Sequence, residues 1–288
     1  MSAPTLPRAA RPAAGTRTDG PTFARVVASE WTKLTSLRSP WWTGAVTVVV
    51  GGVIAYLGAT ASSVDPGFQP ASDLATGLLL AQIGPLVLGV LVGAGEFRTG
   101  AFRTTFTLVP RRTPVLAAQA LVVTAFALVL GLLVLAAGVL GILPAARSRD
   151  LPLGLTEGET PGVMAGIVLL VVGLALLGFA IGALLRRTVP AMVTALVTTI
   201  LAPAVLMMMG DPGADASGQA LPHQQTVPGT LGTLVPGGAA QLLTLPDSFG
   251  PMPGAPDLGP VGGGLVLAAW VVLLLALAAV RLRARDPR

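Results

Sequence analysis

The chain has 288 residues, of which 53% are hydrophobic and only 11% are charged, whereas soluble domains carry about 25% charged residues. It has no cysteine and one histidine, His223, which excludes disulfides, a thiolate metal site and a metal centre built on histidines. The net charge is +5, but the sequence also contains long runs without charge, so we expect the chain to contact membrane lipids. We expect it to bind neither nucleic acid nor a cofactor.

Two segments precede the first long apolar run. Residues 1–21 are rich in Ala, Pro and Arg and have no apolar periodicity, which predicts a disordered tail. Residues 22–39 predict an amphipathic helix, because the apolar side chains fall within an arc of roughly 140° on a helical wheel. We expect this helix to lie along the membrane interface as an elbow that leads into the first span. The apolar residues are Phe23, Val26, Val27, Trp31, Leu34 and Leu37.

Glu30 falls inside this apolar arc, where a carboxylate needs hydrogen-bond donors. Lys33 follows three residues later, so an i,i+3 ion pair is one explanation. A side chain raised to the lipid headgroups is a second explanation. A functional role for the carboxylate is a third.

Long uncharged runs predict an all-α integral membrane protein with six transmembrane helices, because a helical span needs about 20 apolar residues. The spans are expected at about 41–61, 74–95, 115–143, 163–185, 189–209 and 264–280. One membrane domain over residues 22–281 is the natural organisation, followed by a short cytoplasmic tail at 282–288. Within the loop 210–263 we predict a short membrane-surface helix near 230–243, although Pro236 and two glycines interrupt it.

The distribution of cations predicts how the chain crosses the membrane. Six spans put both ends on one side, and the segments on that side hold sixteen of the eighteen cations. The other side holds only Arg147 and Arg149. By the positive-inside rule, both termini are expected in the cytoplasm. The high usage of Ala, Gly, Pro and Arg is typical of a GC-rich bacterial genome, so we expect a multi-pass protein of a bacterial cell membrane.

The predicted spans contain no Asp, Glu, Lys, Arg or His, the side chains that ion-coupled carriers usually keep at membrane depth. Gln82 and Gln119 are the strongest polar groups there, and we expect each to hydrogen-bond a neighbouring helix. No catalytic motif is present. A Walker loop is excluded because the only lysine, Lys33, follows threonine rather than glycine. We therefore predict that the chain is not an enzyme and does not itself bind ATP.

Small residues recur at the spacing of closely packed membrane helices. The stretch "GVLVG" runs from Gly89 to Gly93, and "GFAIG" runs from Gly178 to Gly182. Such glycines let a neighbouring helix approach closely. They indicate packing inside one subunit or, alternatively, the face of a dimer.

Two stretches resemble the permease subunits of bacterial ABC exporters of the type-2 class, most closely the actinobacterial members. They are "ASEWTKLTSLRSPWW" before the first span and "GEFRTGAFRTTFTLVPRRTPVLAAQAL" between the second and third. The resemblance implies a pathway subunit that pairs with a second copy or a homologous permease. It also implies a separate ATPase subunit that binds ATP and Mg²⁺ and contacts the elbow and the first cytoplasmic loop.

The resemblance assigns coupling to the ATPase to a set of residues in these two stretches: Glu30, Glu96, Arg98, Thr99, Gly100, Arg103, Arg111 and Arg112. Members of the family usually have Lys near the start of the third span, where this chain has Gln119. We expect this difference to matter little.

Two other functions are compatible with the same sequence. One is a transporter or channel that does not use ATP, and the other is a membrane scaffold or assembly factor. A neighbouring ATPase gene favours the exporter, whereas proton-dependent flux favours a transporter without ATP. The apolar spans do not indicate which substrate is carried.

Overall fold

The computed structural model describes residues 22–99, 112–210, 225–252 and 254–283, and within these ranges all regular structure is helical. Six stretches in it are long and apolar enough to cross a membrane, which confirms the prediction of an all-α integral membrane protein with six spans. The tail predicted at residues 1–21 lies outside the described residues. The six stretches are Arg38–Ser62, Pro70–Gly95, Thr113–Ser148, Thr160–Leu185, Thr188–Met209 and Gly259–Leu282.

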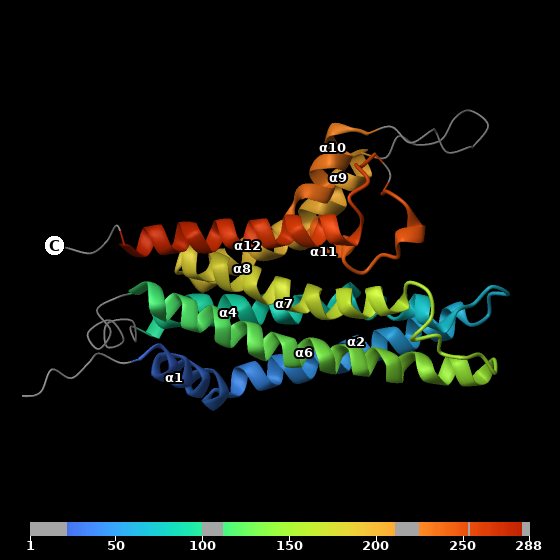
Figure 1. Cartoon of the computed structure of the whole chain (residues 1–288), viewed down its shortest axis with the longest axis horizontal. Helices are drawn as coiled ribbons and strands as arrows, with labels where there is room; N and C mark the ends of the chain where they lie inside the picture. Colours follow the sequence, from blue (N-terminus) through green and yellow to red (C-terminus); the bar gives the residue numbers. More distant parts are fainter. Residues whose placement is uncertain (1–21, 100–111, 211–224, 253, 284–288) are drawn as a thin grey trace, which may run out of the picture.

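The first two helices form the predicted elbow and the first span. Helix α1 (Phe23–Ser36) ends where Leu37 takes an extended conformation, and α2 (Arg38–Ser62) starts directly after it. The elbow helix is therefore shorter than the predicted 22–39, because Arg38 and Ser39 already belong to the first span. Figure 1 shows α1 at an angle to the long helices of the bundle.

The second span is not the continuous helix predicted at 74–95. It consists of a 3₁₀ turn η1 (Pro70–Asp73), a single turn α3 (Leu78–Ala81) and then α4 (Ile83–Thr99). Pro85 lies in the first turn of α4, where a proline needs no hydrogen-bond donor, and it favours a helix start at this point. Gln82 donates to the Leu79 carbonyl in its own segment, so the expected hydrogen bond to a neighbouring helix is wrong for this residue.

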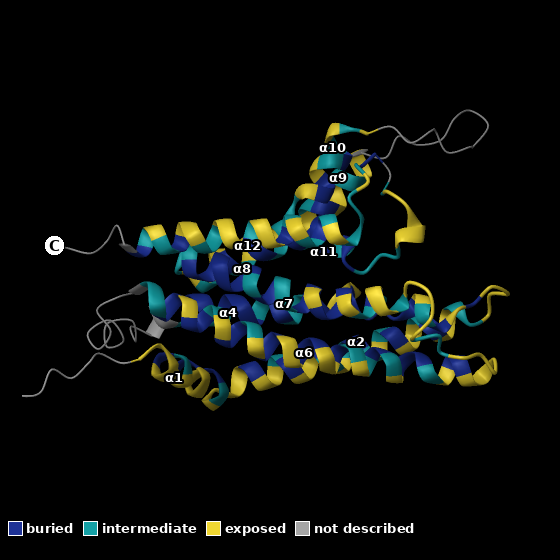
Figure 2. Cartoon of the chain, viewed as in Figure 1, coloured by how far each residue is buried: buried dark blue, intermediate teal, exposed yellow. Residues whose placement is uncertain are grey.

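The third and fourth spans are long helices at the centre of the bundle. Helix α6 (Arg112–Ser148) extends beyond the predicted 115–143 and contains Pro144 in its last turn and a half. Helix α7 (Thr160–Leu185) is the most buried span, with 72% of the residues in its apolar window buried, against 17% for the fifth span. Figure 2 shows that buried residues concentrate where α4 and α7 run side by side.

The fifth span is broken in the middle by a π-helix. It comprises α8 (Thr188–Leu196), the π-helix η2 (Val197–Leu201) and α9 (Ala202–Gly210). Pro203 explains the break, because it has no N–H to offer the Thr199 carbonyl and its ring crowds that carbonyl. The Ala202 N–H instead bonds the Val197 carbonyl, five residues back.

The last third of the chain corrects the prediction of one surface helix near 230–243. Two helices occupy this segment, α10 (Val227–Leu234) and α11 (Pro236–Leu242), and α11 is buried against α7, α12 and η2. Pro236 starts the second helix rather than merely interrupting one. After a 3₁₀ turn η3 (Asp247–Phe249), α12 (Gly259–Arg283) forms the sixth span.

The two ends of the bundle differ in charge. Figure 1 shows the start of α1 and the end of α12 at one end, which we call the α1 end; the other is the far end. The α1 end carries the cations Arg25, Lys33, Arg38, Arg186 and Arg281. Of these, Arg281 donates a hydrogen bond to the Leu184 carbonyl. Arg147 and Arg149 lie at the far end, in and after the last turn of α6.

Candidate functional site at the α1 end

Helix α1 presents two different apolar faces. Val26, Glu30 and Leu34 recur every four residues and are buried, so they form the line along which α1 rests on the bundle. Phe23 and Trp31 belong to the same predicted arc but are exposed. The arc is therefore divided between a protein-facing line and an outward-facing edge suited to lipid.

Glu30 lies in the middle of the buried line and has a side-chain partner on each of two helices. Its side chain is only 6% exposed. One carboxylate oxygen accepts from Lys33 Nζ at 2.5 Å, and the other accepts from Gln119 Nε2 of α6 at 3.2 Å. The sequence-based ion pair with Lys33 is thus present, and the side chain turns toward the bundle rather than to the surface. Hydrogen bonds to a charged group contribute about 1.5–3 kcal/mol each when buried.

Apolar contacts flank this polar link on both sides. Toward the start of α1, Val26 packs with Val115 and Ala118 of α6. Toward its end, Leu34 packs with Leu88 of α4 and Val122 of α6. Gln119 therefore lies between two apolar clusters. Because α1 is held by apolar contacts above and below one hydrogen bond, both its position and its rotation about its own axis are fixed.

Gln119 is the residue whose role the sequence did not reveal. Its expected hydrogen bond to a neighbouring helix is present, but the partner is the elbow helix rather than another span. The sequence offered one indication of this pair: α1 has a single carboxylate in its apolar arc, and α6 has a single side-chain amide in an apolar stretch. The expectation that Gln119 in place of the family's Lys matters little stays a prediction.

A cavity of about 500 Å³ opens beside the Glu30 link. Its wall combines polar groups from α1 and α2 with apolar side chains from α4 and α6. Lys33 and Arg38 both lie on it, and Lys33 keeps 46% of its side chain exposed. The cavity thus brings charged and apolar side chains together around one volume.

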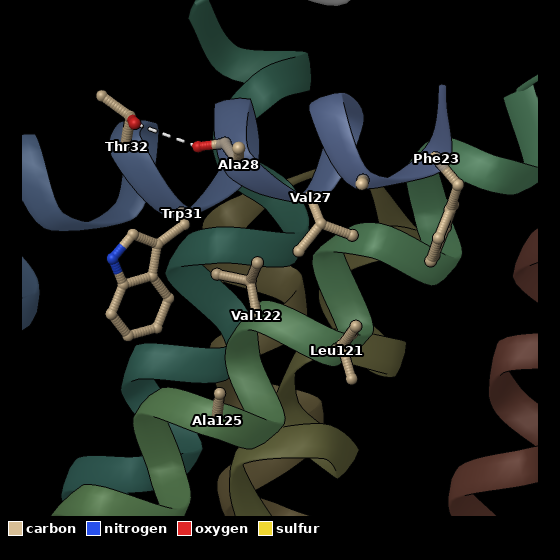
Figure 3. A pocket seen from close by; sticks show the side chains of 9 residues that line it. Phe23, Val27, Ala28, Trp31, Thr32, Leu121, Val122 and Ala125 are labelled. Carbon is tan, nitrogen blue, oxygen red and sulfur yellow. Dashed lines mark hydrogen bonds between the residues drawn. The ribbon is translucent and has the colours of Figure 1, made fainter. Parts of the chain in front are cut away.

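A second hollow on the other side of α1 is apolar. Figure 3 shows Phe23, Val27 and Trp31 of α1 facing Leu121 and Ala125 of α6 across it. Its volume is about 660 Å³, and its lining contains almost no polar surface. Such a groove suits an acyl chain or another apolar segment, and it offers no group for chemistry.

Several of the predicted coupling residues lie at the end of α4. Glu96, Arg98 and Thr99 belong to its last turn, and Arg112 opens α6 at the same end of the bundle. Gly100, Arg103 and Arg111 lie outside the described residues. The backbone therefore brings the ends of α4 and α6 to the end where α1 packs, and α1 contacts α6 directly.

The two glycine motifs meet each other inside the chain. A methyl group on Gly89 would come within 3.0 Å of backbone atoms of Ala175 and Phe179 in α7, and Gly93 meets α7 in the same way one turn later. Gly178 and Gly182 approach the backbone of α4 at Leu86 and Val90 in return. Because four glycines line this contact, α4 and α7 pack backbone to backbone.

The far end contains a buried carboxylate just before the predicted start of the second span at residue 74. Asp73 is buried at the entry to the second span, and its Oδ1 atom accepts from Ser62 Oγ at 3.4 Å and Thr76 Oγ1 at 3.3 Å. Its Oδ2 atom has no hydrogen-bond partner among the described residues. Across the described ranges, no group of three or more His, Cys, Asp or Glu side chains is arranged to hold a metal ion.

No family model matches the chain, and no curated protein matches it.

Proposed function

We propose that this chain is the permease subunit of an ATP-driven exporter in a bacterial cell membrane. It forms the substrate pathway together with a second copy or a homologous permease. A separate ABC ATPase binds ATP and Mg²⁺ and drives the movement of the spans.

One observation carries this proposal. The two sequence stretches that resemble type-2 ABC permeases come together at one end of the bundle, although the first span and most of the second separate them along the chain. The Ser29–Lys33 stretch is on α1, which packs on α6 close to Arg112, and Glu96 is in the last turn of the neighbouring α4. A partner docked there would contact both stretches at once.

ATP chemistry in this proposal belongs to the partner. We expect the purified chain alone to show no ATP photolabelling that unlabelled ATP competes away, because it has no Gly-Lys pair. A complex formed by coexpression with the ATPase of a neighbouring gene should show labelling on the ATPase only. Specific labelling of the isolated chain would contradict the assignment.

Copurification and flux measurements separate the exporter from the two alternative functions. Copurification of an ABC ATPase with stoichiometric permease supports the exporter. Proton-dependent flux in proteoliposomes without any ATPase would instead support a transporter of another class. Copurification with an unrelated enzyme and no flux would support a scaffold.

The proposed topology places the α1 end in the cytoplasm, because sixteen of the eighteen cations lie in segments on that side. Single cysteines can be introduced freely, since the chain has none. We expect a membrane-impermeant thiol reagent to label Ser217→Cys from outside intact cells and not Ser36→Cys. Labelling of Ser36→Cys after the cells are opened is the control, and the reverse pattern in intact cells would overturn the topology.

A further inference from the structure

We propose that the cavity of about 500 Å³ beside Glu30 binds the phosphate headgroup of an anionic phospholipid. We call it the headgroup cavity. The inference needs only the membrane fold, so it holds whether or not an ATPase drives the chain.

Arg38 supplies the positive charge that the headgroup cavity offers to a ligand. Lys33 also borders the cavity, but its charge faces Glu30 at 2.5 Å. Arg38 is exposed, lies on the cavity wall, and forms no ion pair with any acidic side chain in the part of the chain that the structure describes. The one carboxylate on the wall is thus already neutralised, and the remaining guanidinium favours an anion with oxygen acceptors in a fixed geometry.

The start of α2 adds hydrogen-bond donors to the same wall. Leu37 is the N-cap of this 25-residue helix, and no side chain caps it. The N–H groups of Arg38 and Ser39 therefore lack helical partners and favour a negative charge, whereas Pro40 in the same turn has no N–H. Ser39 and Thr43 of the same helix also line the cavity and carry hydroxyl groups. Arg38 and these donors therefore all belong to the first two turns of α2.

The apolar part of the lining decides in favour of a lipid over free phosphate. It includes Leu88, Leu91 and Val92 of α4 and Val122 of α6. An inorganic phosphate would leave these side chains against water. A phospholipid would cover them with the first carbons of its chains, at about 25 cal/mol per Å² of apolar surface removed from water. The cavity also lies where the spans end, at the depth at which headgroups meet acyl chains.

The test measures lipid binding to the full-length chain in detergent by native mass spectrometry. We expect short-chain phosphatidylglycerol to bind more tightly than phosphatidylcholine with the same chains. Arg38→Gln should weaken binding of phosphatidylglycerol by about tenfold, the effect of losing one charge-assisted hydrogen bond. Arg25→Gln is the matched control, because it removes the same charge from an exposed position on α1 that does not line the cavity. Its affinity should stay within about twofold of the unmodified chain.

A second variant tests the apolar wall independently of charge. Leu91→Trp should fill the cavity and reduce phosphatidylglycerol binding even if Arg38→Gln proves unstable. Glycerophosphoglycerol, which is phosphatidylglycerol without its acyl chains, should not compete at equal concentration. Equal losses in Arg38→Gln and Arg25→Gln, equal binding of phosphatidylcholine, or competition by glycerophosphoglycerol would each overturn the proposal.

Discussion

Replacing Gly178 by alanine is expected to lower the thermal midpoint of the chain in detergent by about 3–10 °C. The added methyl group would come within 3.0 Å of the Leu86 carbonyl in α4, and backbone cannot rotate away as a side chain can. The two most closely packed helices would have to separate, and overpacking of this kind costs about 1–3 kcal/mol. Gly89→Ala should have a similar effect, since it meets the backbone of α7 from the opposite side.

Gly162→Ala is the matched control on the same helix. Gly162 lies in the first turn of α7, and a methyl group there would meet no atom within 4 Å. Its midpoint should be unchanged or slightly higher, because alanine favours a helix over glycine by about 0.5–1 kcal/mol. The double variant Gly89→Ala, Gly178→Ala should lose less than the sum of the single losses, because one separation of α4 from α7 relieves both clashes. Equal midpoints for Gly178→Ala and Gly162→Ala would show that the glycine contact does not hold the bundle together.

Glu96→Gln is expected to leave insertion and expression intact and to reduce the ATPase turnover of the assembled complex by about tenfold, or to uncouple it from export. The residue lies in the last turn of α4, and α4 is locked to α7 by the glycine contact. Movement at the end of α4 would therefore be transmitted to α7, because the two helices are packed too closely to move independently. The expectation rests on the proposed function, in which a carboxylate at the end of this span takes part in coupling to the ATPase.

Glu30→Gln provides a graded comparison for this effect. A glutamine can still accept the hydrogen bond of Gln119 but loses the charge that faces Lys33, so a similar but smaller loss of ATPase turnover is expected. Both variants should be compared with the unmodified complex for ATPase rate and export in the same vesicles. Normal turnover and export with Glu96→Gln would remove the coupling role of this carboxylate.

The elbow illustrates how far sequence reasoning reaches. The apolar period of residues 22–39 indicated the helix. The position of Glu30 inside the apolar arc indicated that its carboxylate needs hydrogen-bond donors. The partner could not be identified in the same way, because Gln119 is 89 residues away and no local pattern relates the two positions. Lys33 was accessible to prediction because an i,i+3 contact is set by the helix itself.

The breaks within the second and fifth spans could not be predicted from the sequence. Uncharged sequence reports that a segment is apolar, but it does not reveal whether the helix through it is continuous. Gly77 lies where α2 passes so close that an added methyl group would meet the Gly51 backbone, and Pro203 breaks the fifth span at η2. Proline and glycine are frequent in this chain, so their presence alone does not single out the positions that change the helix. The sequence predicted one surface helix near 230–243, whereas the segment forms two helices, and the burial of α11 depends on contacts with α7 and α12.

During biosynthesis the Glu30–Gln119 hydrogen bond can form only after both α1 and α6 have been made. The ribosome releases α1 well before α6, so Glu30 reaches the membrane when Lys33 is the only one of its two side-chain partners that has been made. At that stage α1 has none of the α6 residues that pack around it, including Val115 and Val122. Of the described helices, α1 is translated first, yet its contacts are completed only after α6 has been made, and nascent chains that end before residue 119 lack the hydrogen bond that joins the elbow to α6.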